Sequence, residues 1–92
     1  MILDKKAFGK LLGEAREKAG LSQIALAKKL GYVSPQYVSN WERGVCGPPI
    51  DKLGLLTKVL SIKPEILLGM ILDQTEMYLR SELKLPKSRS IL

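Results

Sequence analysis

The chain has 92 residues, 46% of them hydrophobic but only five of them aromatic, and its 15 Lys and Arg against nine Asp and Glu give a net charge of +6. With one Cys and no His, an intramolecular disulfide, a Cys/His zinc site and every His-based catalytic arrangement are excluded. The length predicts one small domain. The charge suggests an anionic partner such as nucleic acid or a membrane surface, although a basic protein without such a partner would have the same composition.

The positive charge is concentrated in residues 1–63, which hold eleven Lys and Arg against five Asp and Glu, whereas residues 64–92 hold four of each. The first two thirds are therefore the part expected to face an anion. The N-terminus has no apolar segment typical of a signal peptide, and the longest apolar run, 66–72, is too short to cross a bilayer. We expect a cytoplasmic protein with no membrane segment, in which Cys46 is a free thiol.

Apolar residues recur at spacings of three and four up to about residue 84, and no segment alternates as a strand would, so the sequence predicts an all-α fold. Five helices are expected, over about 4–19, 23–30, 35–43, 50–60 and 64–83. Ser22 and Ser34 are the expected N-caps, with Pro35 at the first helical position. The expected core comprises Phe8, Leu11, Leu12, Ala15, Leu26, Ala27, Leu30, Val38, Trp41, Leu53, Leu56 and Leu60.

The second and third helices are short and joined by a tight Gly-containing turn, which is typical of a helix-turn-helix. At about 100° per residue, the third helix divides into two faces. Val38, Trp41 and Glu42 cluster on one side; Gln36, Asn40 and Arg43 cluster on the other, with Tyr37 and Ser39 on the flanks. Amide side chains donate and accept together and so match the major-groove edge of adenine. The alternative is a polar face that contacts only solvent.

Four segments carry a family resemblance: "AREKAGLSQ" (15–23), "LAKKLG" (26–31), "VSNWERG" (38–44) and "PPIDKLGLLTKVLSIKPEILL" (48–68). Over residues 8 to about 70, the chain resembles the lambda-repressor-like, XRE-type helix-turn-helix family of bacterial and phage regulators. The resemblance implies a five-helix DNA-binding domain whose third helix enters the major groove. The chain has no His, no metal cluster and no phosphate-binding Gly-rich loop, so no enzymatic activity, cofactor or metal is expected. By position it implies base-facing roles for Gln36, Tyr37 and Asn40, and phosphate contacts for Ser22, Gln23, Ser34, Ser39 and Arg43.

The resemblance also implies a buried or half-buried ion pair between Arg16 and Glu42. Such a pair would neutralise the one acidic side chain on a helix that otherwise faces DNA; a solvated Glu42 is the alternative. The turn departs from the family by one extra residue, Tyr32, which would either project toward DNA or pack against the protein. The loop over 44–47, often basic in the family, is "GVCG" here.

The chain is expected to comprise a DNA-binding bundle over 1–64, a C-terminal helix over 65–84 and a flexible tail over 85–92. Beyond Met70, an apolar stripe continues past what the small bundle could cover, which predicts a homodimer through residues 66–83; folding back onto the bundle is the alternative. The stripe comprises Ile71, Leu72, Thr75, Tyr78, Leu79 and Leu83.

These expectations combine into a sequence-specific double-stranded DNA-binding regulator, a dimeric repressor on a palindromic site. Two recognition helices would lie about one DNA turn apart, ~34 Å. The competing interpretation is an antitoxin or adaptor that uses the same fold as a protein-interaction module and holds a protein partner through its C-terminal helix.

Overall fold

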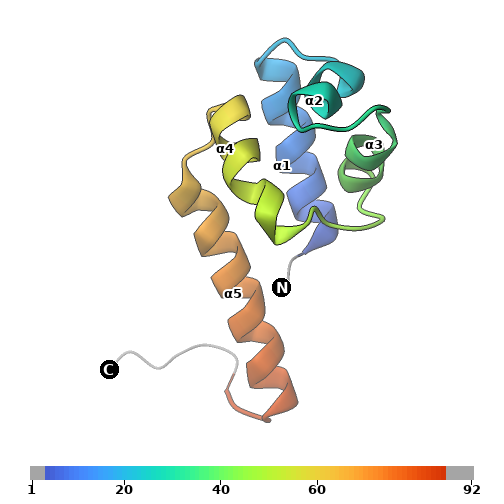
Figure 1. Ribbon diagram of the computed structural model, residues 1–92. Coiled ribbons are helices and arrows are strands. Elements are labelled where there is room, and N and C mark those ends of the chain that lie inside the picture. The colour runs from blue at the N-terminus through green and yellow to red at the C-terminus, as the bar shows by residue number, and fades with distance from the viewer. Residues whose placement is uncertain (1–3, 87–92) are drawn as a thin grey trace.

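A computed structural model describes residues 4–86, so most of the expected tail lies outside the described residues. The helices are α1 (Lys5–Lys18), α2 (Gln23–Lys29), α3 (Gln36–Glu42), α4 (Leu53–Leu60) and α5 (Pro64–Glu82), with a 3₁₀ turn, η1, over Ile50–Lys52. No strand occurs between residues 4 and 86. The predicted all-α, five-helix fold is confirmed. The first four helices form a bundle, and α5 extends away from it (Figure 1), so that the molecule measures 46 × 23 × 20 Å.

Side-chain caps set the starts of the first two helices. Asp4 Oδ1 accepts a hydrogen bond from the Ala7 N–H at 3.0 Å, and Ser22 Oγ accepts one from the Ala25 N–H at 3.1 Å. Each bond satisfies one backbone donor that lacks a partner within the helix. The prediction of Ser22 as an N-cap is therefore confirmed.

The start of α3 lies one residue later than predicted. Pro35 occupies the N-cap position with φ −79° and ψ 0°, and no side chain caps the helix. Ser34 Oγ accepts only a long hydrogen bond, 3.4 Å, from the Gln36 N–H. The backbone of Pro35 lies in the right-handed helical region, but the first residue of α3 is Gln36. The prediction that Ser34 caps a helix beginning at Pro35 is wrong by one position.

The predicted fourth helix, 50–60, is two elements. Its first turn is the 3₁₀ segment η1, in which the Lys52 N–H donates to the Pro49 carbonyl at 3.0 Å, and the α-helix begins at Leu53. Single 3₁₀ turns are common at the N-terminal ends of α-helices. Leu56 and Leu60 are buried as predicted, whereas Leu53 is only partly buried against the core.

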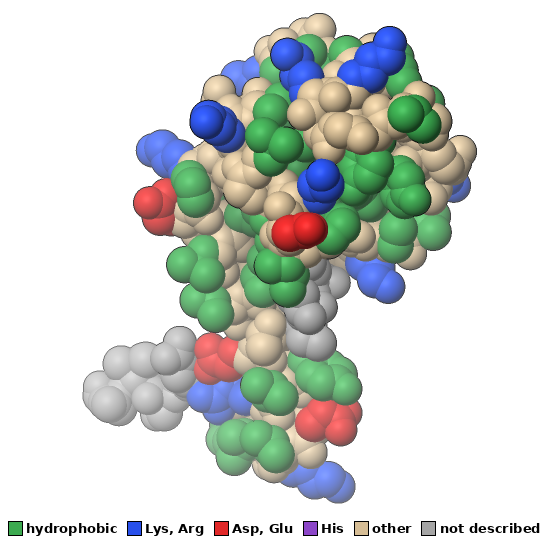
Figure 2. All heavy atoms as spheres, viewed as in Figure 1, with side chains coloured by type: hydrophobic (Ala, Val, Ile, Leu, Met, Phe, Trp, Pro, Cys, Tyr) green, Lys and Arg blue, Asp and Glu red, His purple; other side chains and the backbone are tan. Residues whose placement is uncertain are grey.

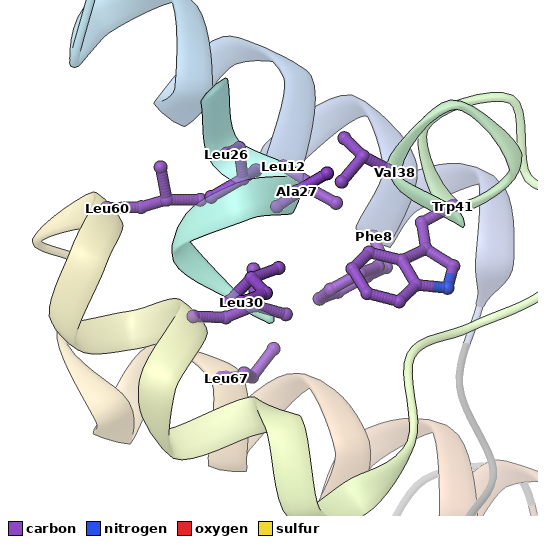
Figure 3. Packing of buried hydrophobic residues seen from close by; sticks show 10 residues of the cluster. Phe8, Leu12, Leu26, Ala27, Leu30, Val38, Trp41, Leu60 and Leu67 are labelled. Atoms are coloured by element: carbon purple, nitrogen blue, oxygen red, sulfur yellow. The ribbon is translucent and has the colours of Figure 1, made fainter. Parts of the chain in front are cut away.

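One hydrophobic core joins all five helices (Figure 3). Its buried members are Phe8, Leu12, Leu26, Ala27, Leu30, Val38, Trp41, Leu56, Leu60 and Leu67. The predicted inward residues Leu11 and Ala15 are only half-buried. Leu67 is the one residue of α5 in this buried set, and Met70 and Ile71 pack partly against it. The first two turns of α5 therefore complete the bundle, and the remainder of the helix projects from it.

Gly9 lets α1 and α3 approach backbone to backbone. A Cβ at this position would lie 2.5 Å from the Trp41 carbonyl oxygen and 2.6 Å from that of Glu42, distances that real Cβ atoms do not show. Only glycine permits this contact without displacing one of the helices. The close approach therefore sets the position of the C-terminal end of α3 on α1.

No helix within residues 4–86 is long and apolar enough to span a membrane. Over the same residues, no group of three or more His, Cys, Asp or Glu side chains is arranged to hold a metal ion.

Candidate nucleic-acid interface

The two faces of α3 differ sharply in burial. Val38 and Trp41 are 0% and 1% exposed, which confirms that they anchor the helix in the core. Gln36, Tyr37 and Arg43 are exposed, and Ser39 and Asn40 are half-buried. A short helix is thus held by its apolar side and presents amide, phenol, hydroxyl and guanidinium groups on the other. These groups can donate and accept hydrogen bonds from base edges and phosphates.

Hydrogen bonds link the polar side chains of this outer face. Asn40 Oδ1 accepts from Gln36 Nε2 at 2.9 Å and from Arg43 Nη2 at 2.5 Å. Arg43 Nε also donates to Ser39 Oγ, at 3.3 Å. These i, i+3 and i, i+4 contacts follow the helical period. These hydrogen bonds are exposed to solvent, so each contributes little net free energy. The side chains can therefore exchange these partners for groups on a ligand.

The Arg16–Glu42 contact ties α1 to the end of α3. Arg16 Nε donates to Glu42 Oε2 at 2.5 Å and Arg16 Nη2 donates to Glu42 Oε1 at 3.1 Å, and both side chains are only 12% exposed. This two-point geometry is the strongest form of an Arg–carboxylate contact. The hydrogen bond to Glu42 is the main reason that the pKa of Arg16 is raised, against the opposing effect of burial. Arg16 Nη1 also donates to the Leu21 carbonyl at 2.7 Å.

Gln23 contacts the same ion pair, whereas the family resemblance assigns it to the phosphate contacts. Its Nε2 donates to Glu42 Oε1 at 3.1 Å, so its side chain is turned toward the α1–α3 contact and is not displayed outward. This contact has a simple cause: a half-buried carboxylate needs several donors, and Gln23 lies within reach of it. Ser22 remains exposed, and Ser34 is half-buried.

Tyr32, the extra residue of the turn, packs against the protein. Its ring stacks on Tyr37 with centroids 4.5 Å apart and meets Trp41 edge-on at 5.9 Å. Burial is the main cause that raises the pKa of Tyr32, with smaller contributions from Tyr37 and Asp51. Of the two placements left open by the sequence, projection toward DNA and packing, the structure shows packing.

Lys52 is a structural residue of this region that the sequence did not indicate. Its Nζ donates to the Leu30 carbonyl at 2.9 Å and lies 5.2 Å from the centre of the Tyr32 ring. The ammonium thus ties η1 to the end of α2 and contributes a cation–π contact. No local pattern links residues twenty positions apart, so only the folded arrangement shows this role.

The projecting part of α5 exposes apolar side chains (Figure 2). Leu72, Tyr78, Leu79 and Leu83 of the predicted stripe are 57%, 51%, 48% and 65% exposed. Ile71, which the sequence placed in the same stripe, instead packs partly against the core of its own chain because it lies close to the bundle. Thr75 is half-buried. The sequence also overlooked Met77 and Leu85, which are 60% and 50% exposed.

Charged side chains flank this apolar surface. Arg80 Nε donates to Glu76 Oε2 at 2.8 Å, and Arg80 Nη1 donates to the Pro86 carbonyl at 3.0 Å. An apolar groove lies beside the pair, lined by Leu72, Thr75, Glu76, Leu79, Arg80, Leu83 and Leu85. A contiguous apolar surface edged by charged groups is typical of a protein contact.

Comparison with known proteins supports the family resemblance predicted from the sequence. Residues 12–67 match the helix-turn-helix family. Over 63 residues, 68% of this chain, the sequence is 38% identical to the HTH-type transcriptional regulator ImmR of Bacillus subtilis (strain 168), and the match spans 49% of that relative's length. The family match covers α2, α3 and α4 in full and reaches from the second half of α1 to the first turn of α5. The chain therefore belongs to the XRE-type helix-turn-helix family.

Proposed function

We propose that this chain is a sequence-specific double-stranded DNA-binding transcriptional regulator, a dimeric repressor that reads the major groove with α3. The observation that carries the proposal is the outer face of α3, where the exposed Gln36 and Arg43 are both hydrogen-bonded to the half-buried Asn40 in one row. The row belongs to a helix held firmly on its other side by Trp41 and Glu42. Rigid placement of a few polar groups is what base reading requires.

The distribution of charge supports the same proposal. The first 63 residues carry the whole net charge of +6, which attracts a polyanion over long range and releases its counterions on binding. Figure 2 shows Lys and Arg side chains spread over the bundle. Glu42 would oppose this attraction, but its carboxylate is paired with Arg16. The helix that faces DNA therefore presents no uncompensated negative charge.

Separate side chains have separate roles in the proposed complex. Gln36, Tyr37 and Asn40 face base edges or the groove wall, while Ser39 and Arg43 lie beside them toward the phosphates. Ser22 and the backbone N–H groups at the start of α2 face a phosphate, because a helix N-terminus is electropositive. Gln23 contributes through its backbone in this arrangement, since its side chain is bound to Glu42.

Dimerisation through α5 would place two α3 helices on one palindromic site. The exposed apolar face of α5 supports a second copy of this chain as the occupant, and the separation of the two reading helices would then match about one DNA turn, ~34 Å. The same face favours a second candidate function, an antitoxin or adaptor that binds a different protein through α5. A stoichiometric heterocomplex formed in preference to the DNA complex would select that alternative.

Selection of bound sequences from a random duplex pool tests the proposal directly. We expect an enriched palindrome, and affinity that falls steeply as salt rises. Gln36→Ala and Asn40→Ala should each lose about 1–3 kcal/mol of discrimination at particular base pairs. Arg43→Ala is the matched comparison: it should weaken binding to every sequence and lower the salt slope by about one. Equal enrichment of all sequences by the wild-type protein would refute the proposal.

A further inference from the structure

The turn between α2 and α3 holds Tyr32 by contacts on several sides. Its backbone N–H donates to the Ala27 carbonyl at 2.9 Å, which fixes the residue at the end of α2. Its ring stacks on Tyr37 at an interplanar angle of 29° and meets Trp41 at 71°. A half-buried ring with a fixed backbone and two aromatic neighbours has little freedom of rotation.

Lys52 adds a fourth constraint. Its Nζ lies 5.2 Å from the Tyr32 ring centre while donating to the Leu30 carbonyl at 2.9 Å. The ammonium is therefore held in place by the end of α2 and does not swing freely over the ring. Trp41 is fully buried. Tyr32 therefore contacts the core through Trp41 and η1 through Lys52, and its other face is available for stacking.

Tyr37 is what lies on that face. It is 52% exposed and extends from the first turn of α3, beside Gln36 and on the side proposed to meet DNA. An exposed tyrosine on a helix would ordinarily sample several rotamers, and ordering it on binding would reduce affinity. Stacking on a ring that is itself fixed removes that freedom before DNA arrives.

We propose that Tyr32 is a positioning residue for DNA reading: it holds the Tyr37 ring in one orientation, so that Tyr37 contributes to the choice of base pair. The inference rests on the proposed DNA-binding function and adds to it a residue that does not itself touch DNA. Tyr32 acts through Tyr37, so its loss affects discrimination between sequences and leaves the phosphate contacts in place.

The test measures the ratio of affinities for the selected site and for random duplex of the same length. Tyr32→Leu keeps an apolar side chain against Trp41 but removes the stacked ring, and we expect this ratio to fall about two- to tenfold, the effect of freeing one side chain. Tyr32→Phe retains the ring and should restore the wild-type ratio. The slope of affinity against salt should be the same in all three proteins, because no phosphate contact is lost.

A double-mutant cycle that combines Tyr32→Leu with Tyr37→Ala distinguishes an effect of Tyr32 through the Tyr37 ring from a general effect of Tyr32 on the structure. If Tyr32 acts through Tyr37, the double variant should show no greater loss of the ratio than Tyr37→Ala alone. An unchanged ratio in Tyr32→Leu, or losses that add in the double variant, would overturn the inference while leaving DNA binding intact. A wild-type protein with no sequence preference would instead overturn the proposed function, and this inference with it.

Discussion

Replacing Glu42 by Gln removes one charge from the contact between α1 and α3 while keeping the shape of the side chain. Arg16 would then keep its positive charge in a site where its side chain is 12% exposed, facing a neutral amide with one acceptor oxygen in place of a carboxylate, while the Leu21 carbonyl still accepts from Nη1. Stranding one partner of a buried ion pair typically costs about 3–5 kcal/mol. Because both side chains retain some exposure and Leu21 still accepts, the expected loss is at the lower end, about 3 kcal/mol.

Thermal and urea unfolding followed by circular dichroism measure this loss. For a domain of this size, about 3 kcal/mol corresponds to a fall in Tm of roughly 12–24 °C. Glu17→Gln is the matched control: it removes the same charge 3.9 Å from the same Arg16 guanidinium, but Glu17 is 75% exposed. An exposed pair is worth about 0–1 kcal/mol, so this variant should unfold close to the wild-type temperature.

A double replacement distinguishes two contributions to the free energy of unfolding: the cost of leaving one buried charge unpaired and the net stabilisation by the ion pair. Arg16→Met combined with Glu42→Leu removes both charges and leaves apolar side chains, although Met is shorter than Arg. Replacing a buried ion pair by well-packed apolar residues is often nearly neutral. The double variant should therefore recover most of the stability lost in Glu42→Gln. If Glu42→Gln and Glu17→Gln shifted the Tm equally, the contact would be worth no more than a surface pair and the reasoning would be refuted.

Three further outcomes follow from the structure. Gly9→Ala would bring a Cβ within 2.5 Å of an α3 carbonyl oxygen and should cost at least about 1–3 kcal/mol in urea unfolding, whereas Gly54→Ala, which meets nothing within 4 Å, should stabilise by about 0.4–1 kcal/mol. Burial raises the pKa of Tyr32 above 10.0, so its contribution to stability is complete below that pH and is lost as the pH rises above it; alkaline unfolding of Tyr32→Phe should show a smaller decline. In sedimentation, Leu79→Glu in the full chain should abolish the proposed dimer, while Val33→Glu, at a side chain 94% exposed in the turn before α3, should leave it intact; a dimeric Leu79→Glu would contradict the proposed α5 interface.

Helical periodicity was enough to predict the two faces of α3. Val38 and Trp41 are buried, and Gln36 and Arg43 are exposed, as angular spacing along a helix requires. The start of α3 was predicted less accurately, because a proline fits more than one position at the beginning of a helix. Pro35 suits both the N-cap position, which it occupies here, and the first helical position, and a residue sequence does not distinguish the two.

Contacts between remote segments were beyond the reach of local pattern. Gln23 has the same polar amide whether it faces a phosphate or Glu42, and the bond to Glu42 exists because α2 and α3 are packed together. Lys52 gave no signal for the same reason, since its partners Leu30 and Tyr32 come close only when η1 folds against the turn. The predicted stripe on α5 included Ile71, which packs partly against the core, and omitted the exposed Met77 and Leu85, because the sequence does not show where the bundle stops covering the helix.

Stabilising contacts and the proposed DNA-reading residues occupy opposite sides of α3. The inner side carries the contacts that fix the helix: the backbone approach at Gly9, the buried Trp41 and the paired Glu42. The outer side carries Gln36 and Asn40, whose hydrogen bonds join only side chains of the same helix. Because the outer row supports no other element, its residues can change without loosening the bundle. In the proposed DNA complex, substitutions on the outer face would therefore change the target sequence while the inner face keeps the helix in place.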